Sequence, residues 1–302
     1  MLKKEQILIH LLNMKNKTLQ EATINMGILI AFWSPLHGRG NTSNCIATAM
    51  QLSMKYNIES YITHTHYTRS TMECAFLDGK EEEDILKLSD LGLDSINRAI
   101  KAGLDVEDVK SYCNKINDKL YLISGSKKSN IEVFQENIGR DFGNICDFIK
   151  QGDNVCFVDI DSGYKSDIAK EIIDIADYVV VTLDQTNLLC EDYLSSDFRV
   201  NQEKEITVMG RFDNNSKYTK KYLSKKFKKE VFVIPTDSEF LDSLNNHRVK
   251  SFFDKKYDIE DDLFFDELNI LVDELASNLE AKGMFLKLRE EKPKKKFIFF
   301  NI

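Results

Sequence analysis

The most constraining feature of the chain is a glycine loop between an apolar run and a helix-forming stretch, at residues 28–48 (ILIAFWSPLHGRGNTSNCIAT). The loop carries Gly38 and Gly40, and Thr42 and Ser43 follow where a helix would begin. Glycines let backbone amides close around an anion, and the N-terminus of a helix adds a positive field. The segment is therefore typical of a strand, a phosphate-binding loop and a helix.

The loop departs from the ordinary phosphate-binding motif at one position, where Asn41 replaces a lysine. In G-x-x-x-x-G-K-[ST], the lysine neutralises the terminal phosphates and the hydroxyl that follows binds magnesium. Asn41 offers hydrogen bonds without charge, and a lost charged contact weakens binding by about 1.5–3 kcal/mol. Arg39 is the nearest compensating cation, and Thr42 or Ser43 is the expected metal ligand. The alternative interpretation is a glycine turn that binds no ligand.

Composition limits the remaining possibilities. The 302 residues suit one large soluble domain with appendages. A net charge of −8 disfavours binding of nucleic acid by the whole surface. The basic stretch 217–229 (KYTKKYLSKKFKK) is a possible DNA contact, but a solvated helix is the favoured interpretation. The chain has no apolar run of about 20 residues that would span a membrane. Its six cysteines lack C-x-x-C spacing, which indicates reduced thiols in the cytoplasm.

Apolar runs and helical stretches alternate along the chain. This pattern predicts an α/β fold, with a mostly parallel sheet flanked by helices. The expected strands are 26–32, 60–65, 119–123, 154–159, 178–183, 205–209 and 230–234. The expected helices are 44–54, 79–118, 131–150, 165–175, 219–227 and those beyond 238. The expected parts are an N-terminal helical extension (1–25), a nucleotide-binding domain (26–253), and a C-terminal helix with a basic tail (254–302).

An acidic strand end in the second half of the chain supports the nucleotide interpretation. The strand NVCFVD (154–159) ends in Asp159, and Asp161 and Gly163 follow. In phosphate-loop proteins, an acid at such a strand end orients magnesium and its water. Asp159 is therefore the candidate catalytic residue and, with Thr42, the candidate metal ligand. The alternative is an ordinary aspartate that caps a turn.

The order of these motifs resembles that of the ParA/MinD-type ATPases, a deviant branch of the phosphate-loop NTPases. LHGRGNTS (36–43) sits where that family has K-G-G-x-G-K-T-[TS], and VCFVDIDSG (155–163) is similar to its strand ending in D-x-x-x-G. Later segments, IADYVVVTLDQTNLLCEDYL, ITVMGRF and VFVIPTDSEFLDSLNNHRV, resemble its last strands. The resemblance covers about 26–253 and implies a homodimer that binds ATP or ADP with Mg²⁺. It also implies an adenine pocket near Arg211, Phe212, Pro235 and Asp237.

The chain departs from the family at three functional positions. The signature lysine that reaches the partner's nucleotide falls on Leu36, and the main phosphate lysine falls on Asn41. The family's aspartate after the second strand is missing from the segment that holds His64 and His66. One cation can contribute about 10³–10⁵-fold to phosphoryl transfer, so we expect weak or no hydrolysis. The alternatives are a scaffold that binds no nucleotide and an active ATPase that uses Arg39.

The closest resemblance within the family is to atypical TadZ-like members. It implies a protein partner in a positioned machinery, such as one for secretion, conjugation or plasmid maintenance. TadZ proteins carry a receiver-like domain before the ATPase, and the roughly 25 residues before the first strand are too few for one. The chain is therefore expected to have a core of TadZ character without being a TadZ protein.

Three further segments have two interpretations each. The tail 292–302 (KPKKKFIFFNI) predicts a peripheral membrane contact through its lysines and aromatic residues, while an edge strand or docking on a partner subunit explains it equally well. His64 and His66 would form a metal site with Glu73 or Cys74, but hydrogen-bonded histidines are the favoured interpretation. The run 80–84 (KEEED) is expected to be a solvated helix start.

Overall fold

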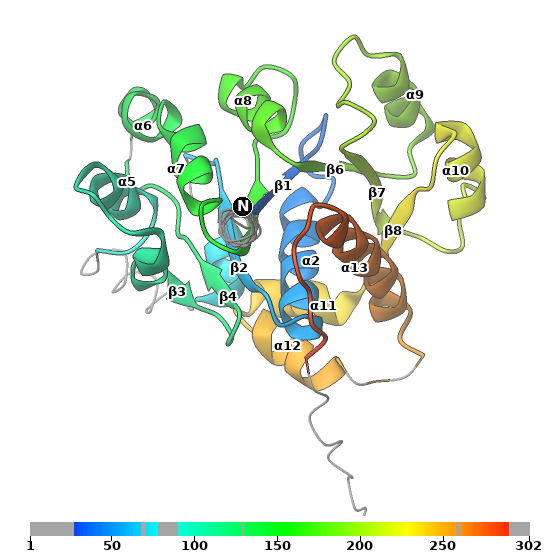
Figure 1. Ribbon diagram of the computed structural model, residues 1–302. Coiled ribbons are helices and arrows are strands. Elements are labelled where there is room, and N and C mark those ends of the chain that lie inside the picture. Colours follow the sequence, from blue (N-terminus) through cyan, green and yellow to red (C-terminus); the bar gives the residue numbers. More distant parts are fainter. Residues whose placement is uncertain are drawn as a thin grey trace, which may run out of the picture.

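The computed structural model describes residues 27–67, 71–77, 90–128, 130–257, 259 and 261–289. The expectations for the N-terminal extension (1–25), the acidic run (80–84) and the basic tail (292–302) lie outside the described residues. The described chain forms one sheet with helices on both faces (Figure 1). No helix in the described part is both long and apolar enough to cross a membrane.

The sheet has eight strands in the order β3-β4-β2-β5-β1-β6-β7-β8 among the described residues. Their bounds are β1 (Ile28–Trp33), β2 (Glu59–His64), β3 (Asn114–Lys115), β4 (Leu120–Leu122), β5 (Asn154–Asp159), β6 (Tyr178–Leu183), β7 (Glu205–Phe212) and β8 (Phe232–Pro235). Neighbouring strands are parallel, except for the antiparallel pair β3 and β4. The expected α/β fold with a mostly parallel sheet is therefore confirmed. The carboxyl ends of β2, β5, β1 and β6 meet at one edge of the sheet, which is where ligands bind in such folds.

The helices form two layers around the sheet (Figure 1). The elements that pack into the core containing Ile30 and Phe32 are α2 (Asn41–Lys55), α3 (Thr71–Phe76), α11 (Ser238–Asn245), α12 (Val249–Lys256) and α13 (Leu263–Ala281). Those in the core containing Leu29 and Trp33 are α5 (Leu93–Lys101), the 3₁₀ helix η1 (Val106–Tyr112), α6 (Ile131–Phe134), the π turn η2 (Gln135–Gly139), α7 (Phe142–Ile149), α8 (Asp167–Ile175), α9 (Asn187–Ser195) and α10 (Lys220–Phe227). Alternate residues of β1 thus enter opposite cores, which explains the continuous apolar run.

Several predicted boundaries were wrong. The expected helix 131–150 is interrupted by the π turn η2. The described part of the expected helix 79–118 is not one continuous helix, because α5, η1 and β3 follow one another there. The helix α5 stops because Gly103 adopts a φ of 90°, which glycine tolerates and a continuing helix does not. The short edge strand β3 was not predicted, and β7 continues past residue 209 to Phe212.

Candidate functional site

The loop between β1 and α2 has the backbone shape of an anion cradle. Gly38 and Gly40 adopt φ values of 76° and 83°, which glycine reaches without strain. The 15-residue helix α2 begins at Asn41, three residues earlier than expected, and Gly40 before it offers no capping side chain. Its first turn carries no acidic side chain. The amides at this helix end are therefore available to a negatively charged ligand.

Asn41 connects the loop to the sheet. Its Nδ2 donates to the carbonyl oxygen of Phe32 at 2.8 Å and to Oδ1 of Asp159 at 2.7 Å. Its Oδ1 is buried and has no hydrogen-bond partner among the described residues. Both amide hydrogens are thus used inside the protein. The ParA/MinD-type ATPases have their phosphate lysine at this position, whereas here the side chain of Asn41 holds β1, β5 and the loop together.

Asp159 lies at the centre of the polar contacts below the loop. Its side chain is 1% exposed, and besides the bond from Asn41 its Oδ2 accepts a hydrogen bond from Thr42 Oγ1 at 2.6 Å. The Nε2 atom of His66 lies 3.1 Å from the same Oδ2. The register of β2 and β5, which pairs His64 with Asp159, brings this histidine to the carboxylate. Sequence reasoning placed Thr42 and Asp159 together but did not connect His66 to them.

His66 bridges two carboxylates. Its second ring nitrogen, Nδ1, lies 2.6 Å from Oδ1 of Asp161. Burial lowers the pKa of the imidazole, but the hydrogen bonds to Asp159 and Asp161 outweigh it and raise the pKa to about 10. The ring is therefore an imidazolium at neutral pH. The signal in the sequence was a His-x-His pair that starts at the last residue of one strand and an Asp-x-Asp pair that starts at the last residue of its neighbour in the sheet.

His64 is buried behind His66 and bonds to a different carboxylate. The backbone N–H of His66 donates to His64 Nδ1 at 3.2 Å, so the ring hydrogen sits on Nε2, which donates to Glu73 Oε1 at 2.7 Å. The same Glu73 oxygen accepts the N–H of Gly125 at 2.8 Å. Burial raises the pKa of Glu73, but the interactions with His64 and Gly125 lower it by more, so the pKa lies below its ordinary value. In the described part of the chain, no group of three or more histidine, cysteine or acidic residues is arranged to hold a metal ion.

Replacing His66 with glutamine is expected to remove a pH-dependent part of the stability. The folded pKa of about 10 exceeds the ordinary value of about 6.5, so folding favours the protonated ring. This contribution is complete below about pH 6.5 and is lost as the pH rises toward 10. Urea unfolding of both proteins from about pH 6 to about pH 10 should show their difference shrinking with pH. A difference that stays constant would contradict a charged His66.

Arg39 pairs with an acid at the end of the neighbouring strand. Its Nη1 lies 2.5 Å from Oδ2 of Asp184, directly after β6, and its Nε is buried without a partner among the described residues. The pair was not predicted, although Asp184 follows an apolar strand as Asp159 does. The same loop packs against β7, since a Cβ on Gly210 would lie 2.8 Å from the Arg39 carbonyl oxygen and 2.6 Å from Asn44 Nδ2. Glycine is therefore required for this close approach.

The residues expected near adenine are divided between the surface and the core. Arg211 is exposed, has a φ of 50°, and places Cγ 3.6 Å from the position of a Cβ on Gly40. An irregular register between Met209 and Phe212 accompanies this conformation. Phe212 and Pro235 are buried and paired across β7 and β8. Oδ1 of Asp237 caps α11 by accepting the N–H of Phe240 at 2.6 Å. The structure thus brings Arg211 beside the loop. Phe212 and Pro235 pack in the sheet, and Asp237 caps a helix.

The arrangement around Asp159 does not fit magnesium. Mg²⁺ needs oxygen ligands with free lone pairs in an octahedral shell, at about 2.0–2.1 Å. Asp159 Oδ2 already accepts from Thr42 and approaches His66, and Oδ1 accepts from Asn41. The positive ring of His66 would also repel a dication at this position. The expected metal ligands lie together, but a cationic side chain contacts one of them.

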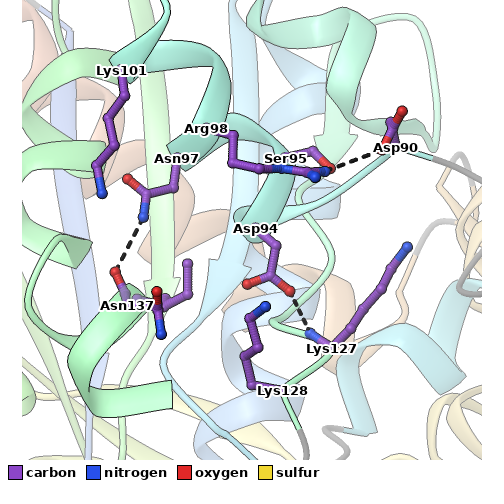
Figure 2. A pocket seen from close by; sticks show the side chains of 10 residues that line it. Asp90, Asp94, Ser95, Asn97, Arg98, Lys101, Lys127, Lys128 and Asn137 are labelled. Carbon is purple, nitrogen blue, oxygen red and sulfur yellow. Dashed lines mark hydrogen bonds and ion pairs between the residues drawn. The ribbon is translucent and has the colours of Figure 1, made fainter. Parts of the chain in front are cut away.

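A polar pocket of about 340 Å³ lies away from the glycine loop, beside α5 and the segment after β4 (Figure 2). Its charged lining residues are Asp90, Asp94, Arg98, Lys101, Lys127 and Lys128. Several of these groups bond to one another, as Figure 2 shows for Asp94 with the N–H of Lys127 and for Asp90 with Arg98. The pocket was not predicted, and its charged lining consists of two aspartates and four basic residues.

Comparison with solved structures shows the fold of ParA and MinD proteins. The ParA family ATPase from Chlorobium tepidum TLS has a TM-score of 0.63 at 13% identity, over 83% of this chain and 99% of that one. MinD complexed with Mg-ADP from Pyrococcus horikoshii OT3 has a TM-score of 0.62 at 13% identity, over 84% and 99%. The MinC:MinD complex of Aquifex aeolicus gives 0.55 at 12%, over 89% and 99%. No protein-family model matches the sequence, and no curated protein sequence does.

Proposed function

We propose that the chain binds ATP or ADP at the loop between β1 and α2 and acts as a ParA/MinD-like positioning or assembly protein. The observation that carries the proposal is the left-handed backbone of Gly38 and Gly40, which leads into an α2 end without a capping side chain. The shared fold with a MinD complexed with Mg-ADP supports it. Residues 26–253 would form the nucleotide-binding domain, with the segments before and after it as appendages.

The proposed ligand contacts follow from the loop. Amides from Gly38 to Ser43, including those of Arg39 and Thr42, would surround the phosphates, as in other loops that precede a helix. Arg211 is the exposed cation beside Gly40 and would contact the phosphates or the base. Asn41 and Asp159 would hold the loop in shape.

Weak or absent hydrolysis is part of the proposal. Arg39 is already paired with Asp184, which disfavours an active ATPase that uses this arginine in place of lysine. At the positions of the two family lysines, Leu36 is exposed and apolar, and the amide hydrogens of Asn41 point into the protein. Stabilisation of developing charge provides most of the rate in phosphoryl transfer. A site with these substitutions would bind nucleotide but hydrolyse it slowly or not at all.

The proposed partners follow from the resemblance. They are a second copy of the chain in a homodimer, and a protein of the machinery that is positioned. The C-terminal tail would add a peripheral membrane contact, and DNA binding is not favoured. Size-exclusion chromatography with light scattering, with and without ATP, tests the homodimer: a nucleotide-dependent rise from monomer to dimer mass is expected, and an unchanged monomer mass would contradict it.

A non-catalytic scaffold is the second candidate function. It is favoured by the contacts of Asn41, Thr42 and His66 with Asp159, which form without any ligand. Calorimetric titration with ATP and ADP, followed by a phosphate-release assay, separates the candidates. Binding without release supports our proposal. Absence of binding selects the scaffold, and fast release selects an ATPase that uses Arg39.

Two glycines provide a matched pair for this titration. Gly38 in the loop and Gly103 after α5 both have positive φ values, and a Cβ at either would meet no atom within 4 Å. Valine at each position should therefore produce similar backbone strain, of order 1–3 kcal/mol. Gly38→Val is expected to weaken ATP binding at least about tenfold, a loss of about 1.4 kcal/mol, while Gly103→Val is not. Equal effects of both substitutions would mean that the loop is not the binding site.

A further inference from the structure

We propose that this chain binds its nucleotide as the free anion, without magnesium, because the imidazole of His66 occupies the place of a divalent cation between Asp159 and Asp161. The inference rests on the proposed nucleotide binding and concerns the form of the ligand. It assigns His66 as the residue that determines this form.

The imidazole ring of His66 lies between two carboxylates. Nε2 lies 3.1 Å from Asp159 Oδ2 and Nδ1 lies 2.6 Å from Asp161 Oδ1, so each ring nitrogen faces a carboxylate. Carboxylates accept hydrogen bonds, and a ring that donates to two of them carries a hydrogen on both nitrogens. One positive side chain therefore bridges two acidic groups, which is the role of a divalent cation between carboxylates.

Hydrogen bonds of the neighbouring segment fix the ring in this position. The N–H of Thr65 donates to the carbonyl oxygen of Asp159 at 3.0 Å, and the N–H of Asp161 donates to Thr65 Oγ1 at 2.9 Å. The N–H of His66 is held by His64, which is itself bonded to buried Glu73. The segment after β2 is thus attached to the segment after β5 through both the backbone and the side chain of Thr65, the residue before His66. His66 cannot leave the carboxylates by a simple side-chain rotation without losing two charge-assisted hydrogen bonds.

Asp159 has little acceptor capacity left for a metal ion. A carboxylate offers about four lone-pair sites, and the contacts from Asn41, Thr42 and His66 use three of them. The fourth lone-pair site is out of reach of solvent, because the Asp159 side chain is only 1% exposed. A hydrated magnesium ion that arrives with a nucleotide would therefore have to displace His66. Magnesium in solution competes with the protein for the nucleotide, since it binds the same phosphates.

The test is calorimetric titration of the full chain with ATP in excess MgCl₂ and in EDTA. The wild-type chain is expected to bind ATP in EDTA at least as tightly as in MgCl₂. Binding that becomes tenfold or more tighter with MgCl₂ would overturn this inference and leave the proposed function standing. Absence of binding in both buffers would overturn the proposed function and this inference with it. The two failures are therefore distinguishable.

Two aspartate variants at neighbouring positions test the assignment of His66 itself. His66→Asp places a third carboxylate beside Asp159 and Asp161, and its ATP affinity should become at least tenfold higher in MgCl₂ than in EDTA. Tyr67→Asp also introduces a carboxylate, one residue further along, where the ring of Tyr67 lies near Phe134, and should show no such dependence. Thermal unfolding confirms that both variants fold. Equal metal responses in the two variants would overturn the assignment.

Discussion

Replacing Asp159 with alanine is expected to lower the free energy of unfolding by about 3–5 kcal/mol, the range for breaking a buried charge pair by removing one partner. The substitution leaves Nε2 of the His66 ring, one amide hydrogen of Asn41 and the hydroxyl of Thr42 without their acceptor. Each of these groups then loses a hydrogen bond at a buried or half-buried position. Urea denaturation at neutral pH measures the difference, provided that the slope with urea is unchanged.

Asp161→Ala is the matched control for this prediction. Asp161 also contacts His66, but its side chain is 34% exposed, and water replaces much of the lost interaction. We expect a loss of about 1 kcal/mol or less, as for exposed ion pairs. If the two alanine variants had equal stability, Asp159 would not be the centre of the contacts below the loop.

Asn41→Lys is expected to tighten ATP binding by about 1.5–3 kcal/mol, or roughly 10- to 150-fold, because it restores a charged contact to phosphate. The lysine would give up the hydrogen bond from residue 41 to the Phe32 carbonyl, so some loss of stability is expected as well. Hydrolysis should remain slow, since Leu36 still occupies the second lysine position. Calorimetry with ATP measures the affinity, and a phosphate-release assay measures the turnover.

Asn41→Met is the control for side-chain length. Methionine is similar to lysine in length and has no charge, so it should remove the contacts of Asn41 without adding attraction for phosphate. The lysine variant should bind ATP more tightly than the methionine variant. If the two bind equally, the phosphates do not lie near residue 41.

The strands and the central acid could be predicted from the sequence because their signals are local. An apolar run such as β5 indicates a buried parallel strand by itself, and Asp159 at its end marks the ligand edge of the sheet. Gly38 and Gly40 likewise indicate a loop with left-handed residues. None of these inferences needed to know which strands are neighbours.

The partners of these residues could not be predicted, because they depend on strand order. His66 meets Asp159 only since β2 lies beside β5, and Arg39 meets Asp184 only since β6 lies beside β1. The histidines were therefore interpreted within their own segment, as hydrogen-bonded residues or a metal pair. The prediction of one continuous helix at 131–150 was wrong for a different reason. The apolar spacing continues through the π turn, so the sequence pattern gives no sign of the interruption.

A crystal structure of the chain grown or soaked with ATP tests the central claim most directly. The account predicts phosphate density against the amides from Gly38 to Ser43, with His66 still between Asp159 and Asp161. A loop that stays empty at saturating ATP, or that is closed by its own side chains, would contradict nucleotide binding at this site.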